Sequence, residues 1–132
     1  MIALLLAMLE ERPPVQSEVL CDFYPMPNPR SDAYCLLLAF EEASRRKFSV
    51  EDCRKLGIHA GRCKDSELLA HSLCNMLGLE YKLEIPSLDE LSQILISCFP
   101  RAIARLVSAG RRIYEDAQGR RLHLSKRSVL GS

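Results

Sequence analysis

The stretch Ser31–Lys47, SDAYCLLLAFEEASRRK, predicts the fold of this chain more directly than any other. Ser31 can cap a helix, Asp32 in the first turn suits the helix dipole, and apolar residues follow at helical spacing. Three cations close the last turn, where positive charge stabilises a helix. The pattern therefore predicts an amphipathic helix within a helical bundle.

Similar signals predict four more helices. They cover Met1–Glu11, residues 49–57, residues 59–77 and residues 88–98, the last after a capping box, Ser87-Leu-Asp-Glu90. In the helix 59–77 we expect a stripe of large apolar side chains to face the core: Leu68, Leu69, Leu73, Met76 and Leu77. The proline-rich stretch Pro13–Pro29 excludes a continuous helix between the first two.

The pattern changes near Gly110. Pro100 is expected to break the helix before it, with Ala102–Leu106 continuing as a second helical piece. Two alternating segments, 111–115 and 120–124, then flank Asp116-Ala-Gln-Gly119 and predict a β-hairpin. The expected fold class is mainly α, a helical bundle over residues 1–109 followed by an incomplete β-hairpin module over residues 110–132.

Charge is unevenly distributed along the chain. Residues 100–132 hold eight Lys/Arg and two acids, whereas residues 1–99 hold ten Lys/Arg and fifteen acids. A clustered basic region indicates a surface that meets phosphates. The alternative is that these arginines only keep surface strands solvated.

The first nine residues, MIALLLAML, are apolar but fit neither kind of membrane-directed segment. A spanning helix needs about 20 apolar residues, and a signal peptide begins with positive charge. We expect a buried helix in a soluble intracellular protein, with nucleus and cytoplasm not distinguished. A start inside an apolar helix, without an N-cap, suggests a chain cut out of something longer.

The side chains that could carry chemistry form no recognisable constellation. The six cysteines show no C-x-x-C and no Cys/His pair at ligand spacing, so we interpret them as packing residues and expect no zinc, disulfide or cofactor. His59, at a helix start, is expected to cap or pack. A thiol pair of Cys53 with His59 would lack a positioned base and an oxyanion site.

Several segments, in this order and spacing, resemble the helicase-associated region of DEAH/RHA-type RNA helicases. They are Ser31–Phe40, Lys47-Phe-Ser49, Cys53, Ile58-His-Ala60, Ile94–Arg105 and Gly110–Leu130. The resemblance implies a ratchet-like helical region (HA2) over residues 1–109, then a truncated OB-fold-like module over residues 110–132. Three departures stand out: Asp52 precedes the cysteine, Gly61 replaces an arginine, and Ser125-Lys-Arg-Ser128 replaces H-P-S-S.

A Walker-A loop, a DEAH box and an arginine finger are all missing from the sequence. We therefore expect no enzyme activity from this chain itself. The resemblance implies an RNA-binding accessory C-terminal region of an ATP-dependent DEAH-type helicase, without its motor domains. Expected partners are single-stranded RNA, helicase motor domains in cis or trans, and an activating protein, with no membrane. The alternative is a protein-interaction adaptor or assembly subunit on the same fold.

The candidate nucleic-acid-binding residues lie in the helix 59–77 and around the hairpin. They are Arg62, Lys64, Arg111, Arg112, Arg120, Arg121, Lys126 and Arg127. A tight turn at 116–119 is expected to bring two of these arginine pairs together on facing strands. Tyr114 can either stack on bases or be buried.

Overall fold

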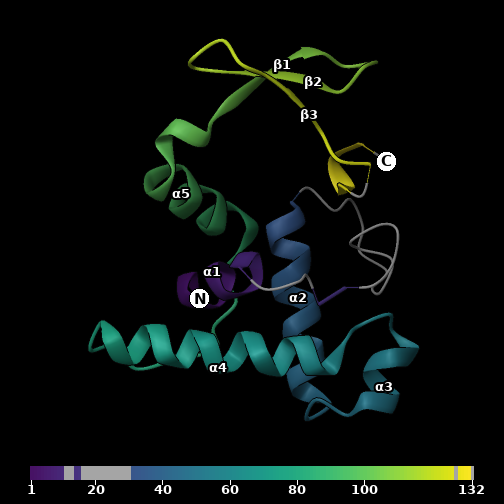
Figure 1. Ribbon diagram of the computed structural model, residues 1–132, viewed down its shortest axis with the longest axis vertical. Coiled ribbons are helices and arrows are strands. Elements are labelled where there is room, and N and C mark those ends of the chain that lie inside the picture. The colour runs from purple at the N-terminus through teal and green to yellow at the C-terminus, as the bar shows by residue number, and fades with distance from the viewer. Residues whose placement is uncertain (11–13, 16–30, 127, 132) are drawn as a thin grey trace.

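The computed structural model describes residues 1–10, 14–15, 31–126 and 128–131 of the 132-residue chain. Within these residues, five α-helices precede a three-stranded antiparallel sheet of order β1-β2-β3 (Figure 1). The elements are α1 (Ile2–Glu10), α2 (Asp32–Arg45), α3 (Val50–Lys55), α4 (Ala60–Met76), α5 (Leu88–Cys98), η1 (Pro100–Ala102), β1 (Ala104–Ser108), β2 (Ile113–Asp116), β3 (Arg121–His123) and η2 (Val129–Gly131), where η marks a 3-10 helix. The predicted fold class, a mainly helical chain followed by a small β module, is confirmed.

Local capping explains where four helices begin. The hydroxyls of Ser31, Ser49 and Ser87 each accept the backbone N–H three residues ahead, at 3.3, 3.4 and 3.3 Å. Glu90 completes the capping box by accepting the Ser87 backbone N–H at 2.8 Å. His59 caps α4, since its Nδ1 accepts the Arg62 N–H at 3.2 Å. These helix starts were predicted and are confirmed.

The core lies between α1, α2 and α4. Leu4 and Met8 of α1 are fully buried with Leu37 and Phe40 of α2. Figure 1 shows α1 lying between α4 and α5, so the expectation that the first helix is buried is correct. None of the helices in the described part of the chain is long and apolar enough to cross a membrane.

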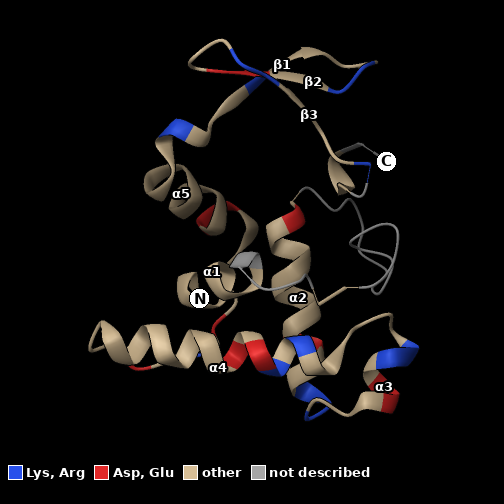
Figure 2. Ribbon diagram, viewed as in Figure 1, with Lys and Arg blue, Asp and Glu red and all other residues tan. Residues whose placement is uncertain are grey.

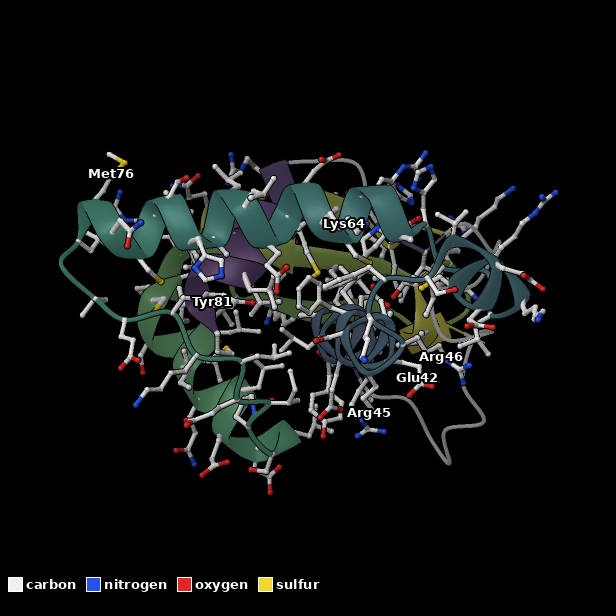
Figure 3. All side chains as sticks on the ribbon, turned by 90° about the horizontal axis from the view of Figure 1, so that it is seen from below. Glu42, Arg45, Arg46, Lys64, Met76 and Tyr81 are labelled. Carbon is white, nitrogen blue, oxygen red and sulfur yellow. The ribbon has the colours of Figure 1, made fainter. Side chains whose placement is uncertain are left out.

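The buried face of α4 differs from the one expected. Small side chains face the core, namely Ala60, Cys63, Ser66, Ala70 and Cys74. Leu68, Met76 and Leu77 are exposed instead, and Figure 3 shows Met76 projecting from the far end of the helix. Small side chains permit the close approach of α1, which packs on α4 more extensively than any other helix does. The predicted stripe of large side chains is therefore wrong for these three residues.

The segment after Pro100 also differs from expectation. It was expected to continue as a helix, but only Pro100–Ala102 is helical, as a short 3-10 helix. Strand β1 begins at Ala104. β1 pairs antiparallel with β2, with Leu106 opposite Tyr114 and a bulge before Ser108. The predicted hairpin thus gains a third strand. This strand stabilises it, because a two-stranded ribbon alone is marginal in water.

The β2–β3 hairpin forms around the predicted turn. Gly119 donates its N–H to the Asp116 carbonyl at 3.0 Å and adopts a φ of +77°, a left-handed value that glycine accepts readily. The Asp116 carboxylate accepts the backbone N–H groups of Gln118 and Arg120, each at 2.9 Å. The turn prediction from Asp116-Ala-Gln-Gly119 is confirmed.

After β3 the chain returns to the helical unit. Val129 is buried in the core cluster, and its N–H donates to the Asp32 carboxylate at the start of α2 at 2.8 Å. Ser128, next to it, is also buried. The sheet is therefore anchored at two points, through α5 and η1 before it and through η2 after it. The division into domains at residue 110 stays a prediction.

Two of the described cysteines, Cys35 and Cys98, depart from the expectation that all are packing residues, and Cys98 is exposed. Cys35, which is buried in α2, is disulfide-bonded, so that expectation is wrong for this residue. Cys53, Cys63 and Cys74 are free and buried, as expected of small apolar side chains. Most of the proline-rich stretch lies outside the described residues. Within it, Val15 forms a β-bridge with Ile58.

Candidate nucleic-acid interface

The predicted basic residues lie in two separate regions. Arg62 and Lys64 lie in the first turns of α4, whereas Arg111, Arg112 and the rest lie on or beside the sheet. Figure 2 shows that helices α1, α2 and α5 intervene between these regions. Arg127 lies outside the described residues. The structure therefore does not bring the whole predicted set together.

The two arginine pairs of the hairpin do not face each other. Glu115 is the partner of Arg121, and the Leu124 N–H donates to the Arg112 carbonyl at 3.1 Å. The pair 120–121 thus lies beside the 116–119 turn, and the pair 111–112 lies at the opposite end of β2. The expectation of facing pairs is wrong, because pairing outward from a turn at 116–119 places Arg112 opposite residue 124.

At the 116–119 turn, Arg120 has a structural partner. Its Nε lies 2.6 Å from Oδ2 of Asp116, a carboxylate that is almost completely buried. The pKa of Asp116 is lowered, first by the hydrogen bond from the Arg120 backbone N–H and further by the Arg120 side chain and the Gln118 N–H. Arg120 therefore helps to hold the turn, and its guanidinium is paired with the Asp116 carboxylate.

A row of charges crosses the sheet next to this turn. Arg105 of β1 and Arg121 of β3 are both directly opposite Glu115 of β2. The Arg105 guanidinium lies 3.1 Å from Glu115 Oε1. Residues opposite each other on neighbouring strands share a face, so this row presents two cations and one anion. The face keeps a net positive charge.

The other end of the sheet carries cations that have no ion pair with an acidic side chain of the described residues. The turn from β1 to β2 closes when the Arg112 N–H donates to the Ala109 carbonyl at 3.1 Å. Arg112 holds a φ of +51°, a region that non-glycine residues rarely occupy. Lys126 follows two residues after Leu124. We call Arg111, Arg112 and Lys126 the basic end of the sheet; among the described residues, none of them has an ion pair.

An apolar row runs across the other face of the sheet from the row of Arg105, Glu115 and Arg121, because successive residues of a strand point to opposite faces. Leu106, Tyr114 and Leu122 are directly opposite one another on β1, β2 and β3. Leu106 is 52% exposed and Leu122 is 44% exposed, while Tyr114 between them is partly buried. Of the two alternatives for Tyr114, full burial is not observed. The row offers a flat apolar surface on which a base could stack.

The basic residues of the helical unit are placed differently. Arg45 and Arg46 both bind Glu42, at 3.5 and 2.8 Å, and Figure 3 shows Glu42 beside them. Lys55 of α3 lies 3.0 Å from Glu51. Lys64 is exposed, but Asp65 follows it directly on α4. Positive charge is thus better compensated here than on the sheet, where residues 104–126 hold six Lys/Arg and two acids.

Arg105 belongs to this surface and was missed among the candidate residues. It was expected to lie in a helical continuation, where it would not reach the hairpin. The short apolar run around Arg105, with β-branched Ile103 and Val107, ends before a glycine-containing turn at 109–112 and is a strand signal that could have placed it. The sheet is therefore more basic than the predicted hairpin alone.

Other chemistry finds little support in the described residues. Among them, no group of three or more His, Cys, Asp or Glu side chains could hold a metal ion. Burial raises the pKa of the Cys63 thiol to about 12, and burial also raises the pKa of Cys53. Both thiols therefore stay protonated near neutral pH, which makes them poor nucleophiles.

Comparison of the chain with protein-family models, with curated proteins and with solved structures finds no match. The resemblance to DEAH-type helicases therefore rests on the sequence motifs alone. The site has to be interpreted from its own geometry and charge.

Proposed function

We propose that this chain is a nucleic-acid-binding accessory region of a DEAH-type RNA helicase, and that its sheet binds single-stranded RNA. The observation that carries the proposal is the basic end of the sheet, where Arg111, Arg112 and Lys126 have no ion pair among the described residues. Arginine offers a planar fork that suits phosphate oxygens. The exposed apolar row of Leu106, Tyr114 and Leu122 supplies the neighbouring flat surface.

In this proposal the RNA backbone contacts the basic end of the sheet and the bases face the apolar row. Tyr114 is the one Phe, Tyr or Trp side chain of residues 104–126, so base stacking relies mainly on this position. The remaining binding energy comes from neutralised phosphates. Binding should therefore be nearly independent of base sequence and strongly dependent on salt.

The accessory role follows from the sequence motifs. The sequence has no Walker-A motif, so in this proposal any motor activity belongs to helicase domains acting in cis or in trans. The chain would then hold the strand that the motor moves. The pure chain is expected to show no ATP turnover, with or without RNA.

The test is a titration of labelled single-stranded homopolymers, followed by fluorescence anisotropy at several salt concentrations. The logarithm of the affinity should fall with the logarithm of salt, with a slope of about 0.7 per phosphate contact. Replacing Arg111→Ala together with Arg112→Gly removes two charges and keeps the left-handed turn. This variant should lower affinity and reduce the slope by about 1.4.

The matched control is Arg54→Ala, which removes an exposed cation of α3. It should leave affinity and slope unchanged. If the double variant and the control behave alike, the sheet is not the RNA-binding surface. Salt-independent binding by the wild-type chain would contradict the proposal as a whole.

A protein-interaction adaptor is the second candidate, favoured by the apolar exposure of the sheet. Ile103, Leu106, Val107 and Leu122 are all exposed on or beside it. Exposed apolar patches of this kind mark interaction sites. Apolar docking responds little to salt, so the same titration separates the two functions.

A further inference from the structure

A groove of about 1100 Å³ lies on the helical unit, away from the sheet. It is bounded by α1, the C-terminal half of α4, the linker after α4, and α5. Its apolar lining includes Ile2, Leu6, Leu73, Leu77, Leu79 and Ile94. Figure 1 shows α1 between α4 and α5, and all three helices contribute residues to the lining.

Large apolar side chains in this groove remain open to solvent. Leu77 is 70% exposed and Leu79 is 59% exposed, although both sit where α4 passes into the linker. Leu77 is part of the stripe that was expected to face the core. Three helices and the linker thus present apolar residues to a single unfilled space.

The linker gives one rim of the groove a negative charge. Its residues alternate: Tyr81, Leu83 and Ile85 pack on the core, while Glu80, Lys82 and Glu84 are exposed. Tyr81 is fixed under α4 by its ring contact with His71, at 4.1 Å between ring centroids (Figure 3).

Glu90 of α5 adds a third carboxylate to the groove. Hydrogen bonds from the backbone N–H and hydroxyl of Ser87 lower its pKa, which keeps it anionic. The one cationic side chain in the lining is Lys82, and it lies 3.5 Å from Glu80. The side chains of the lining therefore carry a negative net charge.

The shape of the groove favours a helix as its occupant. The groove walls are mainly helices, whose backbone groups already bond within each helix. An occupant that buries its own backbone against such walls must satisfy its own hydrogen bonds, as a helix does. A helix also fills the space beside neighbouring helices at ordinary packing distance.

We propose that this groove binds an amphipathic helix of a partner protein, with an apolar face flanked by basic residues. The apolar face covers Leu6, Leu77 and Leu79, and the basic flanks meet Glu80, Glu84 and Glu90. The proposal gives the adaptor alternative a defined site. It does not depend on RNA binding by the sheet, because the groove is a separate surface. Its negative charge also makes it unsuitable for RNA phosphates.

The probe is a labelled synthetic peptide of about 18 residues with leucines at helical spacing and lysines elsewhere. A second peptide has the same leucines and glutamates in place of lysines. Binding of each to the whole chain is followed by fluorescence anisotropy. The lysine peptide should bind at least about tenfold more tightly than the glutamate peptide.

Leu77→Ser with Leu79→Ser should weaken the lysine peptide about tenfold or more. The matched control is Leu68→Ser, because Leu68 is a 67% exposed leucine of α4 that does not line the groove. It should leave binding unchanged. Glu84→Lys should weaken binding of the lysine peptide, whereas Asp65→Lys, outside the groove, should not.

Equal binding of the two peptides, or equal loss in Leu68→Ser and the groove variant, overturns the proposal. So does the absence of measurable binding. Sedimentation of the chain alone covers the other occupant: self-association that Leu77→Ser with Leu79→Ser abolishes would assign the groove to a second copy and refute the proposal. Each result leaves the RNA titration of the sheet unaffected, so the two proposals can fail separately.

Discussion

The helical unit and the sheet of this chain bury their residues very differently. Leu4, Met8, Leu37 and Phe40 are completely enclosed by their neighbours. On the sheet, the central apolar row of Leu106, Tyr114 and Leu122 remains partly or mostly exposed. The contacts of the strands are chiefly with one another, and no described helix covers either face extensively.

The difference indicates how each part is stabilised. The helices gain from apolar burial, which is the dominant favourable contribution to folding. The sheet is stabilised by the hydrogen bonds between its strands, by the turn that Asp116 holds, and by its two connections to the helical unit, through η1 and η2. A surface held in this way can contact a partner without first unpacking a core.

The largest difference should appear in the free energy of unfolding. Phe40→Ala removes a buried ring that packs edge-on against Phe48 at 5.7 Å, and should lower stability by about 3–5 kcal/mol. Phe99→Ala makes the same chemical change at an exposed position before η1, and should cost less than about 1 kcal/mol. Urea unfolding followed by circular dichroism measures both, and similar losses would refute the contrast.

The second difference should appear in backbone protection. Amides of α2 and α4 should exchange with solvent at least about tenfold more slowly than those of residues 113–123, because exposed ladders open locally. Hydrogen exchange read by mass spectrometry can compare the two. Equal protection would mean that the sheet is covered in solution, for example by a second copy of the chain.

A smaller effect concerns pH. The Asp116 carboxylate has a lowered pKa in the folded state, so its contribution to the turn is complete above the unfolded pKa. This contribution is lost as pH falls through the folded pKa. The Gly119 and Arg120 amide resonances should therefore titrate below the range of an ordinary aspartate. Asp116→Ala should loosen the hairpin at neutral pH, and an unchanged hairpin would show that the carboxylate does not hold it.

The smallest effect concerns Arg112. Its left-handed backbone suits glycine, so Arg112→Gly should stay within about 1 kcal/mol of the wild-type stability. Arg112→Val should lose more, since a β-branched residue is strained at positive φ. Thermal unfolding compares them. Equal stabilities would mean that this turn relaxes freely.

The sequence predicted features that depend on neighbours along the chain. Ser31, Ser49, His59 and the Ser87 capping box each act within three residues, and all four helix starts were correct. The 116–119 turn was also found, because Asp116 and Gly119 determine it locally.

Features that depend on distant partners were predicted less well. Leu77 has the same helical periodicity whether or not α1 approaches through Ala70 and Cys74, so its exposure could not be derived from α4 alone. Arg105 was assigned to a helix because its strand partner, Glu115, lies ten residues further along the chain. The expectation that Arg112 and Arg120 lie on facing strands opposite each other was wrong, because the register of the hairpin places Arg112 opposite Leu124.

The proposed contact between RNA and the basic end of the sheet can be tested residue by residue. An NMR titration of the isotope-labelled chain with a single-stranded homopolymer tests it most directly. Amide resonances of 105–126 should shift, most strongly near Arg111 and Arg112, while those lining the groove of α1, α4 and α5 should stay in place. Shifts confined to the region of Arg62 and Lys64, or the absence of any shift, would contradict it.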